Sequence, residues 1–245
     1  MSDRTLRFGQ NSRRFTSLVA AVFLLITAVP AYAEYKPKNR KAASEYTRGG
    51  GSRGCPGSEI PLTLLAPKTF VGKTAAKRPM LAWYMSDSQN VRFQLVEFIS
   101  EQEVKTIGKP KEIKAIAGIN KLKLPTDYPE LTVGKKYFWQ ITLDCEGEDS
   151  ISSRAEFDVV PQSLAKTTFT TIPESVKYYA QNDLWYEALE EALKKTGDGK
   201  LSQSGAILVK QLAQSDMVTN KNKPDNIKLI EKRIEYLQKI SSIRL

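Results

Sequence analysis

The spacing of apolar residues changes once along this chain, and that change constrains the fold more than any other feature of the sequence. Between residues 58 and 161 the apolar residues alternate with polar ones in short segments separated by Pro and Gly, which is typical of antiparallel strands with one buried face. From Ile172 onward they recur at intervals of three and four, which is typical of amphipathic helices. We therefore expect a mainly β protein, with a β-sandwich over 55–161 followed by an α-helical region over 166–245.

The clearest strand is predicted over residues 136–145. Its residues of one parity are apolar and form the expected inner face, namely Tyr137, Trp139, Ile141, Leu143 and Cys145. The other face is polar except for Phe138, which is expected to point outward. Weaker alternation predicts further strands around 62–64, 81–85, 91–95, 122–124 and 155–159. Val96 and Phe98 are apolar on the opposite parity from the residues before them, so a bulge is predicted there.

The residues that lead into the clearest strand resemble the tyrosine corner of immunoglobulin and fibronectin type III domains. In that motif a Leu, a Gly three residues later and a Tyr three residues further mark the turn into a late core strand, and the Tyr hydroxyl bonds to backbone upstream. Leu131, Gly134 and Tyr137 have this spacing here. The resemblance implies an immunoglobulin- or fibronectin-III-like sandwich.

Four helices are predicted in the C-terminal region, over 174–182, 183–195, 201–212 and 225–241. The first two, within YYAQNDLWYEALEEALKK, resemble one tetratricopeptide (TPR) helix hairpin, with Asn182 in place of the usual turn Gly. A TPR array needs about three repeats, so we expect only a TPR-like hairpin in a small helical bundle. Its candidate residues for docking another protein are Trp185, Tyr186 and Leu189.

The first 33 residues have the three parts of a secretory signal peptide. Four arginines (Arg4, Arg7, Arg13 and Arg14) precede an apolar run over 18–29, and Ala31-Tyr32-Ala33 is a small-x-small cleavage site. As a helix the run would rise about 18 Å, short of a hydrocarbon core of about 30 Å. Cleavage after Ala33 is therefore favoured over an uncleaved anchor. The mature protein is expected in the periplasm or outside the cell, with no membrane span.

Residues 34–54 are polar and basic, lack apolar periodicity and end in a run of glycines, so they are expected to form a flexible tether. The segment 49–54 fits the dinucleotide-binding pattern G-x-G-x-x-G. It lacks the strand before it and the helix after it that this pattern requires, so no nucleotide site is predicted there.

The chain has two cysteines, Cys55 and Cys145. In an exported protein they indicate one disulfide, and the absence of a C-x-x-C motif disfavours a redox-active pair or free thiols. In antibody domains the second Cys follows the corner Tyr by two residues, whereas Cys145 follows Tyr137 by eight. The bridge would therefore join the residues before the first strand to the far end of a late strand.

The mature chain over 34–245 has 33 Lys and Arg against 26 Asp and Glu, a net charge of +7. An exported protein meets no genome, so a nucleic-acid partner is not expected. Anionic envelope polymers and lipid headgroups are the acidic partners available to it. A net positive charge also keeps a protein soluble, so it does not require an acidic partner.

Histidine is absent from the chain, which excludes Ser-His-Asp and Cys-His catalysis and His-based zinc sites. No cofactor, metal or catalytic residue is predicted, although a hydrolase that uses two carboxylates stays open. Four acidic residues lie close together in sequence, namely Asp144, Glu146, Glu148 and Asp149. They could ligate Ca²⁺, but a solvated turn is favoured because their spacing fits no calcium loop.

Several motifs in a fixed order resemble one protein family. They are GGGSRGCPG at 49–57, LTLLAP at 62–67, Arg78-Pro79 before Trp83-Tyr84, VGKKYFW at 133–139, Leu143-Asp144-Cys145 and LWYEAL at 184–189. The resemblance is to the cyanobacterial exported group known as domain of unknown function 928, and it covers about residues 49–193. It implies an exported sandwich followed by helices, and it supplies no catalytic residues.

These observations together predict a non-enzymatic exported envelope protein. The sandwich would be a rigid platform, and the helical tail would dock another envelope protein. The alternative is a polysaccharide- or peptidoglycan-binding module, which the net charge of +7 would suit.

Overall fold

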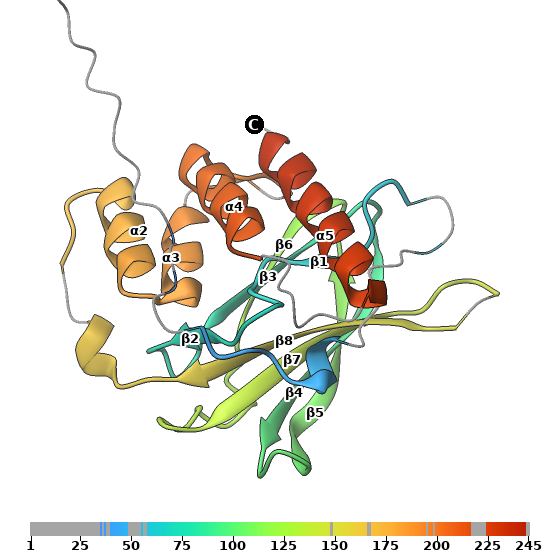
Figure 1. Cartoon of the computed structure of the whole chain (residues 1–245), viewed down its shortest axis with the longest axis horizontal. Coiled ribbons are helices and arrows are strands. Elements are labelled where there is room, and N and C mark those ends of the chain that lie inside the picture. The colour runs from blue at the N-terminus through green and yellow to red at the C-terminus, as the bar shows by residue number, and fades with distance from the viewer. Residues whose placement is uncertain are drawn as a thin grey trace, which may run out of the picture. The chain divides into compact units, whose positions relative to one another are not determined.

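The computed structural model confirms a mainly β chain with helices in its C-terminal part (Figure 1). The residues that it describes are 35, 37, 40–48, 55, 58–147, 149–165, 168–194, 196–197, 199–216 and 224–243. The strands are β1 (Thr63–Leu64), β2 (Gly72–Thr74), β3 (Met80–Met85), β4 (Gln89–Phe98), β5 (Val104–Ala115), β6 (Gly118–Lys123), β7 (Lys136–Leu143) and β8 (Ile151–Val159). The helices are α1 (Glu45–Arg48), α2 (Ile172–Gln181), α3 (Trp185–Ala192), α4 (Gln203–Ser215) and α5 (Pro224–Ser242), with a 3₁₀ turn over Gln162–Ala165.

The described strands form two sheets that share one hydrophobic core. The first has the order β1-β3-β6 and the second the order β2-β8-β7-β4-β5. Neighbouring strands are antiparallel except β2 and β8, which are parallel. Trp83 of β3, Phe93 of β4 and Trp139 of β7 are completely buried in the core. The inner residues of the alternating pattern therefore form the sandwich core, as the period of two predicts.

Helices α2 to α5 lie together on the side of the sandwich away from β4 and β5 in Figure 1, and they share its core. Helix α3 makes the direct connection. The indole N–H of Trp185 donates to the Leu65 carbonyl at 2.9 Å, and the Tyr186 hydroxyl accepts from the indole N–H of Trp139 at 3.1 Å. Buried aromatic side chains thus join the helical region to the sandwich.

The predicted irregularity near the end of β4 is present in its pairing with β5. Phe93 pairs with Lys111 and Leu95 pairs with Ile107, so the extra residues belong to β5. Gly108 lies among them with a φ of +68°, a left-handed conformation that favours glycine. Strand β4 itself alternates without interruption against β7, so the change of apolar parity has another cause.

That cause is a second apolar cluster on the outer face of the five-stranded sheet. Val96, Phe98 and Phe138 form it, and Tyr46 and Val104 pack against them. Phe138 does point away from the core, as its parity predicts, but its exposed fraction is only 4%. It is covered because the chain N-terminal to the sandwich returns across this face.

This covering segment, residues 40–48, is called the N-terminal strap. A flexible tether is the wrong description for the part of 34–54 that the structure describes. The backbone N–H and the hydroxyl of Ser44 and the hydroxyl of Thr47 all donate to Oε1 of buried Glu156. Tyr35 is 1% exposed, and its N–H donates to Gln211 Oε1 at 3.0 Å. The strap is anchored by these side chains and by backbone hydrogen bonds to residues 69–71, and not by a repeating apolar face, so the sequence shows no periodicity there.

The α2–α3 hairpin begins and turns with recognisable local chemistry. The Thr171 side chain caps α2 by accepting from the N–H of Glu174, and Pro173 lies in the first turn. The left-handed residue of the turn is Asp183, with a φ of 63°, and not Asn182, whose φ is −94°. Asp183 is held there by an ion pair to Lys73 of β2 at 2.6 Å.

The predicted signal peptide and the glycine run at 49–54 lie outside the described residues. Among the helices that the structure describes, none combines the length and the apolar character needed to cross a bilayer.

Candidate binding face on the five-stranded sheet

The two cysteines form a disulfide, with their Cα atoms 5.5 Å apart and a sequence separation of 90. Cys55 precedes β1, and Cys145 lies just beyond the end of β7. The bridge therefore fixes the chain between the N-terminal strap and the sandwich to the far end of a central strand.

The three residues of the predicted tyrosine corner meet at the turn before β7. The Tyr137 hydroxyl accepts a hydrogen bond from the backbone N–H of Thr132 at 3.2 Å. Gly134 has a φ of +85°, and Leu131 is buried. The Tyr137 ring stacks on Phe157 of β8. These contacts shape the turn and leave no ligand-facing group at it.

Trp185, Tyr186 and Leu189 cannot be docking residues, because each is at most 1% exposed in the interface between α3 and the sandwich. The apolar stripe of a helix looks the same in sequence whether it faces a partner or its own domain. The sandwich is the partner of this stripe.

The acidic residues at 144–149 form a turn next to the disulfide. Asp144 accepts from the Ser150 hydroxyl at 2.6 Å and pairs with Arg92 at 3.4 Å. Glu148 lies outside the described residues. Within the described part of the chain, no three His, Cys, Asp or Glu side chains are grouped in a way that could hold a metal ion.

Two buried carboxylates connect the helices to the strands. Glu187 Oε1 accepts from the Thr74 hydroxyl and from the N–H groups of Ala75 and Ala76, at 2.7 to 2.9 Å. Burial raises the pKa of Glu187 above its ordinary value. The other is Asp216, which accepts from Nε of Arg233 at 2.9 Å and from the N–H of Thr69 at 3.1 Å. Both carboxylates join chain segments within the core.

The outer face of the five-stranded sheet is polar over three adjacent strands. The pairing aligns Arg92 of β4 with Thr142 of β7, and Thr142 with Ser152 of β8. A second row lies two residues away along the same three strands and consists of Gln94, Gln140 and Arg154. Alternate residues point to the same face, so these six side chains lie together.

Hydrogen bonds connect the side chains of this face. Arg154 Nε donates to Gln140 Oε1 at 2.5 Å, and Gln140 Nε2 donates to the Thr142 hydroxyl at 2.7 Å. On β4, Gln94 Nε2 donates to the hydroxyl of Thr106 at 3.1 Å. The network holds the amide and guanidinium planes in fixed orientations.

Tyr46 of the N-terminal strap borders this polar area. Its ring stacks on Phe138 and meets Phe98 edge-on, with centroid distances of 6.1 and 5.6 Å. Its hydroxyl donates to the Gln102 carbonyl at 3.2 Å, and its own carbonyl accepts from Arg154 Nη1 at 3.3 Å. The ring is fixed yet half-exposed, so one part of it is available to a ligand.

We call Tyr46, Arg92, Gln94, Gln140 and Arg154 the outer-face patch. Sequence reasoning detected part of it, since Gln140 and Thr142 stand out as the polar face of the clearest strand. It could not show that β4, β8 and the strap bring the other members beside them. Which strands become neighbours depends on the strand order of the sheet, and no local sequence pattern indicates that order.

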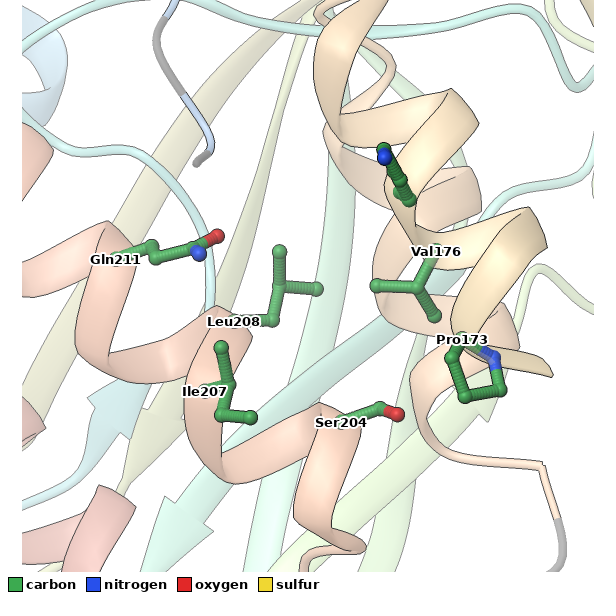
Figure 2. Close-up of a pocket in the computed structure, with 7 residues that line it drawn as sticks. Pro173, Val176, Ser204, Ile207, Leu208 and Gln211 are labelled. Atoms are coloured by element: carbon green, nitrogen blue, oxygen red, sulfur yellow. The ribbon is translucent and has the colours of Figure 1, made fainter. Parts of the chain in front are cut away.

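A second surface feature is a shallow groove between α2 and α4. Figure 2 shows Pro173 and Val176 on one helix facing Ser204, Ile207, Leu208 and Gln211 on the other. Lys177 also lines the groove. Four of its seven lining residues, Pro173, Val176, Ile207 and Leu208, are apolar.

The fold is a two-sheet sandwich that shares its core with a helical region. Comparison with known families makes the assignment specific. Residues 48–221 match the model of Domain of Unknown Function (DUF928), and the chain belongs to this family. No curated protein matches the chain. Helix α5 and Tyr46 lie outside the matched residues.

Proposed function

We propose that the protein is a non-enzymatic component of the cell envelope that binds an envelope polysaccharide on its outer-face patch. The observation that carries this proposal is the fixed array of Gln94, Gln140 and Arg154 beside the half-exposed ring of Tyr46. Helices α2 to α5 lie on the other side of the sandwich in Figure 1, so these helices do not cover the patch.

The chemistry of the patch suits a sugar chain. A pyranose ring has hydroxyl groups around its edge and C–H groups on its faces. Side-chain amides both donate and accept hydrogen bonds. Gln94 uses one N–H on Thr106 and keeps a donor and its oxygen for sugar hydroxyls. Gln140 donates to Thr142 and Ser152, so what it offers a sugar hydroxyl is the second lone pair of Oε1. An aromatic ring provides flat apolar area next to them, and Tyr46 is placed to stack on a sugar face.

Export, by a signal peptide cleaved after Ala33, is part of this proposal. The Cys55–Cys145 disulfide supports it, because such bonds persist in oxidising compartments. We place the protein in the periplasm or outside a cyanobacterial cell. We also propose that the sandwich is immunoglobulin-like, on the strand order and the Tyr137–Thr132 hydrogen bond, and that α2 and α3 are a TPR-like hairpin.

The test is binding of the mature protein to envelope polysaccharide, measured by isothermal titration and by co-sedimentation with the insoluble polymer. The double variant Q94A/Q140A should bind at least tenfold more weakly, because the hydrogen bonds of both amides to the sugar are lost and Arg154 loses its Gln140 acceptor. As a control, K228A/K232A changes two exposed residues on α5 and should bind like the wild type. If both double variants bind equally well, the patch is not the site. Release of reducing ends during incubation would show that the protein is an enzyme.

The groove between α2 and α4 favours a second candidate function, docking of another envelope protein. Ile207 is half-exposed in the groove, so Ile207→Lys would place a charge where an apolar side chain binds. Gln214→Lys adds the same charge to the exposed side of α4, outside the groove lining. Pull-downs from envelope extracts should lose a partner with the first variant and keep it with the second. Equal recovery with both variants contradicts docking in the groove.

A further inference from the structure

The two arginines of the outer-face patch lie in different electrostatic environments. Arg92 is within 4.0 Å of Glu112 and within 3.4 Å of Asp144, so two carboxylates already compensate its charge. Arg154 forms no ion pair with any carboxylate in the described part of the chain. Of these two arginines, Arg154 is therefore the one whose charge no described carboxylate compensates.

The nearest carboxylate along the same face of β8 is Glu156, two residues from Arg154. Glu156 is completely buried under the N-terminal strap, where its two oxygens take the Lys136 ammonium and the donors of Ser44 and Thr47. Both oxygens of Glu156 are therefore engaged by these groups, and Lys136 and not Arg154 compensates its charge.

Arg154 is also held in a fixed orientation. Its Nε donates to Gln140, its Nη1 donates to the Tyr46 carbonyl, and its guanidinium carbon lies 5.6 Å from the centre of the Phe138 ring. Within the described residues Nη2 makes no hydrogen bond. The guanidinium is thus preorganised, with donors left for a ligand, and a planar anion is the ligand that a guanidinium fork binds best.

We infer that Arg154 is the anion subsite of the outer-face patch, and that the polysaccharide bound there carries carboxylate groups. This inference rests on the proposed function and adds the class of the sugar. The carboxylate of an acidic sugar accepts from the free Nη donors of Arg154 while its ring lies against Tyr46. Arg92, compensated by Glu112 and Asp144, contributes little to the preference for acidic sugars.

The experiment compares polygalacturonate with its methyl-esterified form, which has the same backbone without the charges. Wild-type protein should bind the acidic form about tenfold or more tightly than the ester, since charge-assisted hydrogen bonds are lost in the ester. Arg154→Lys keeps the charge but removes the planar fork, and it should lose most of that preference. Arg78→Lys is the matched control and should retain the preference, because Arg78 lies outside the patch and is within 3.9 Å of Glu130.

Three results would overturn the inference. Equal binding of acid and ester by the wild type would contradict it while leaving polysaccharide binding intact. A full preference retained in Arg154→Lys would show that the subsite is elsewhere. Failure to bind either polymer or any envelope polysaccharide would reject the proposed function together with the subsite. Thermal unfolding of each variant checks its folding, and Arg154→Gln provides a second, uncharged variant that should bind both forms equally.

Discussion

The indole N–H of Trp139, in the middle of β7, donates a hydrogen bond to the hydroxyl of Tyr186 on α3 at 3.1 Å. Both side chains are at most 1% exposed. Strand and helix are separated by almost fifty residues in sequence, and this bond joins them in the centre of the shared core. The helical region is therefore part of the structure that supports the five-stranded sheet.

Tyr186→Phe tests this connection. The substitution leaves the Trp139 N–H buried without an acceptor, so we expect it to lower the free energy of unfolding by about 1–3 kcal/mol, measured by urea denaturation. Tyr236→Phe on α5 is the control, because that hydroxyl makes no hydrogen bond within the described residues and the side chain is half-exposed. Equal effects of the two substitutions would show that the Trp139–Tyr186 bond does not stabilise the fold.

Arg233→Ala tests the attachment of α5. Arg233 Nε donates to Asp216 at 2.9 Å, and its Nη2 donates to the carbonyls of Leu64 and Ala66 beside β1. Both ionic side chains are at most 7% exposed. Removing one partner of a buried ion pair costs about 3–5 kcal/mol, so the variant should unfold at markedly lower urea concentration.

The control for this prediction is Lys239→Ala, which removes one partner of the exposed Lys239–Glu235 pair on the same helix. Exposed pairs contribute little, so this variant should unfold like the wild type. If Arg233→Ala behaves in the same way, α5 is held by the packing of Leu237 and Ile240 in the core and not by the buried pair.

Glu187→Gln tests the pH dependence that follows from burial. The pKa of Glu187 is raised in the folded protein, mainly by desolvation, so ionisation of this group disfavours folding. The contribution of Glu187 to the free energy of unfolding is most favourable below its pKa in the unfolded chain, about 4.3. It declines as the pH rises through the pKa of Glu187 in the folded protein. The stability of Glu187→Gln relative to the wild type should therefore increase between about pH 4 and pH 7. A constant difference over this range would contradict a raised pKa.

Removal of the disulfide tests the anchor between the strap and the sandwich. The double variant C55S/C145S should lose about 2–5 kcal/mol of unfolding free energy. Addition of a reducing agent should destabilise the wild type and leave the variant unchanged. A wild-type protein that is insensitive to reductant would show that the bond between Cys55 and Cys145 is not present in solution.

Much of the sandwich could be predicted from alternation alone, because β3, β7 and β8 each bury one complete face. Strand β5 could not be predicted. It lies at the edge of the sheet, and Lys105, Lys109 and Lys114 are exposed along it. Lysines, a proline and a bulge at an edge prevent pairing with another chain, and the same residues remove the apolar signal.

The strap and the helix interface show a different limit. Phe98 and Phe138 carry the information that something covers the outer face, but the covering residue is Tyr46, in a segment whose composition is polar. Trp185 and Tyr186 indicate that α3 needs a partner, and the sequence does not say whether that partner is this chain or another. Such tertiary contacts are decided by topology and not by local pattern.

The most direct test of binding at the outer face is NMR of the ¹⁵N-labelled mature protein during titration with acidic oligosaccharides. The largest shifts should occur in the backbone amides of β4, β7 and β8 that flank Gln94, Gln140 and Arg154, and in the two glutamine side-chain amides. The strap residues around Tyr46 should shift with them. Shifts confined to the groove between α2 and α4, or no shifts at concentrations where envelope polysaccharide is retained, would contradict binding at this face.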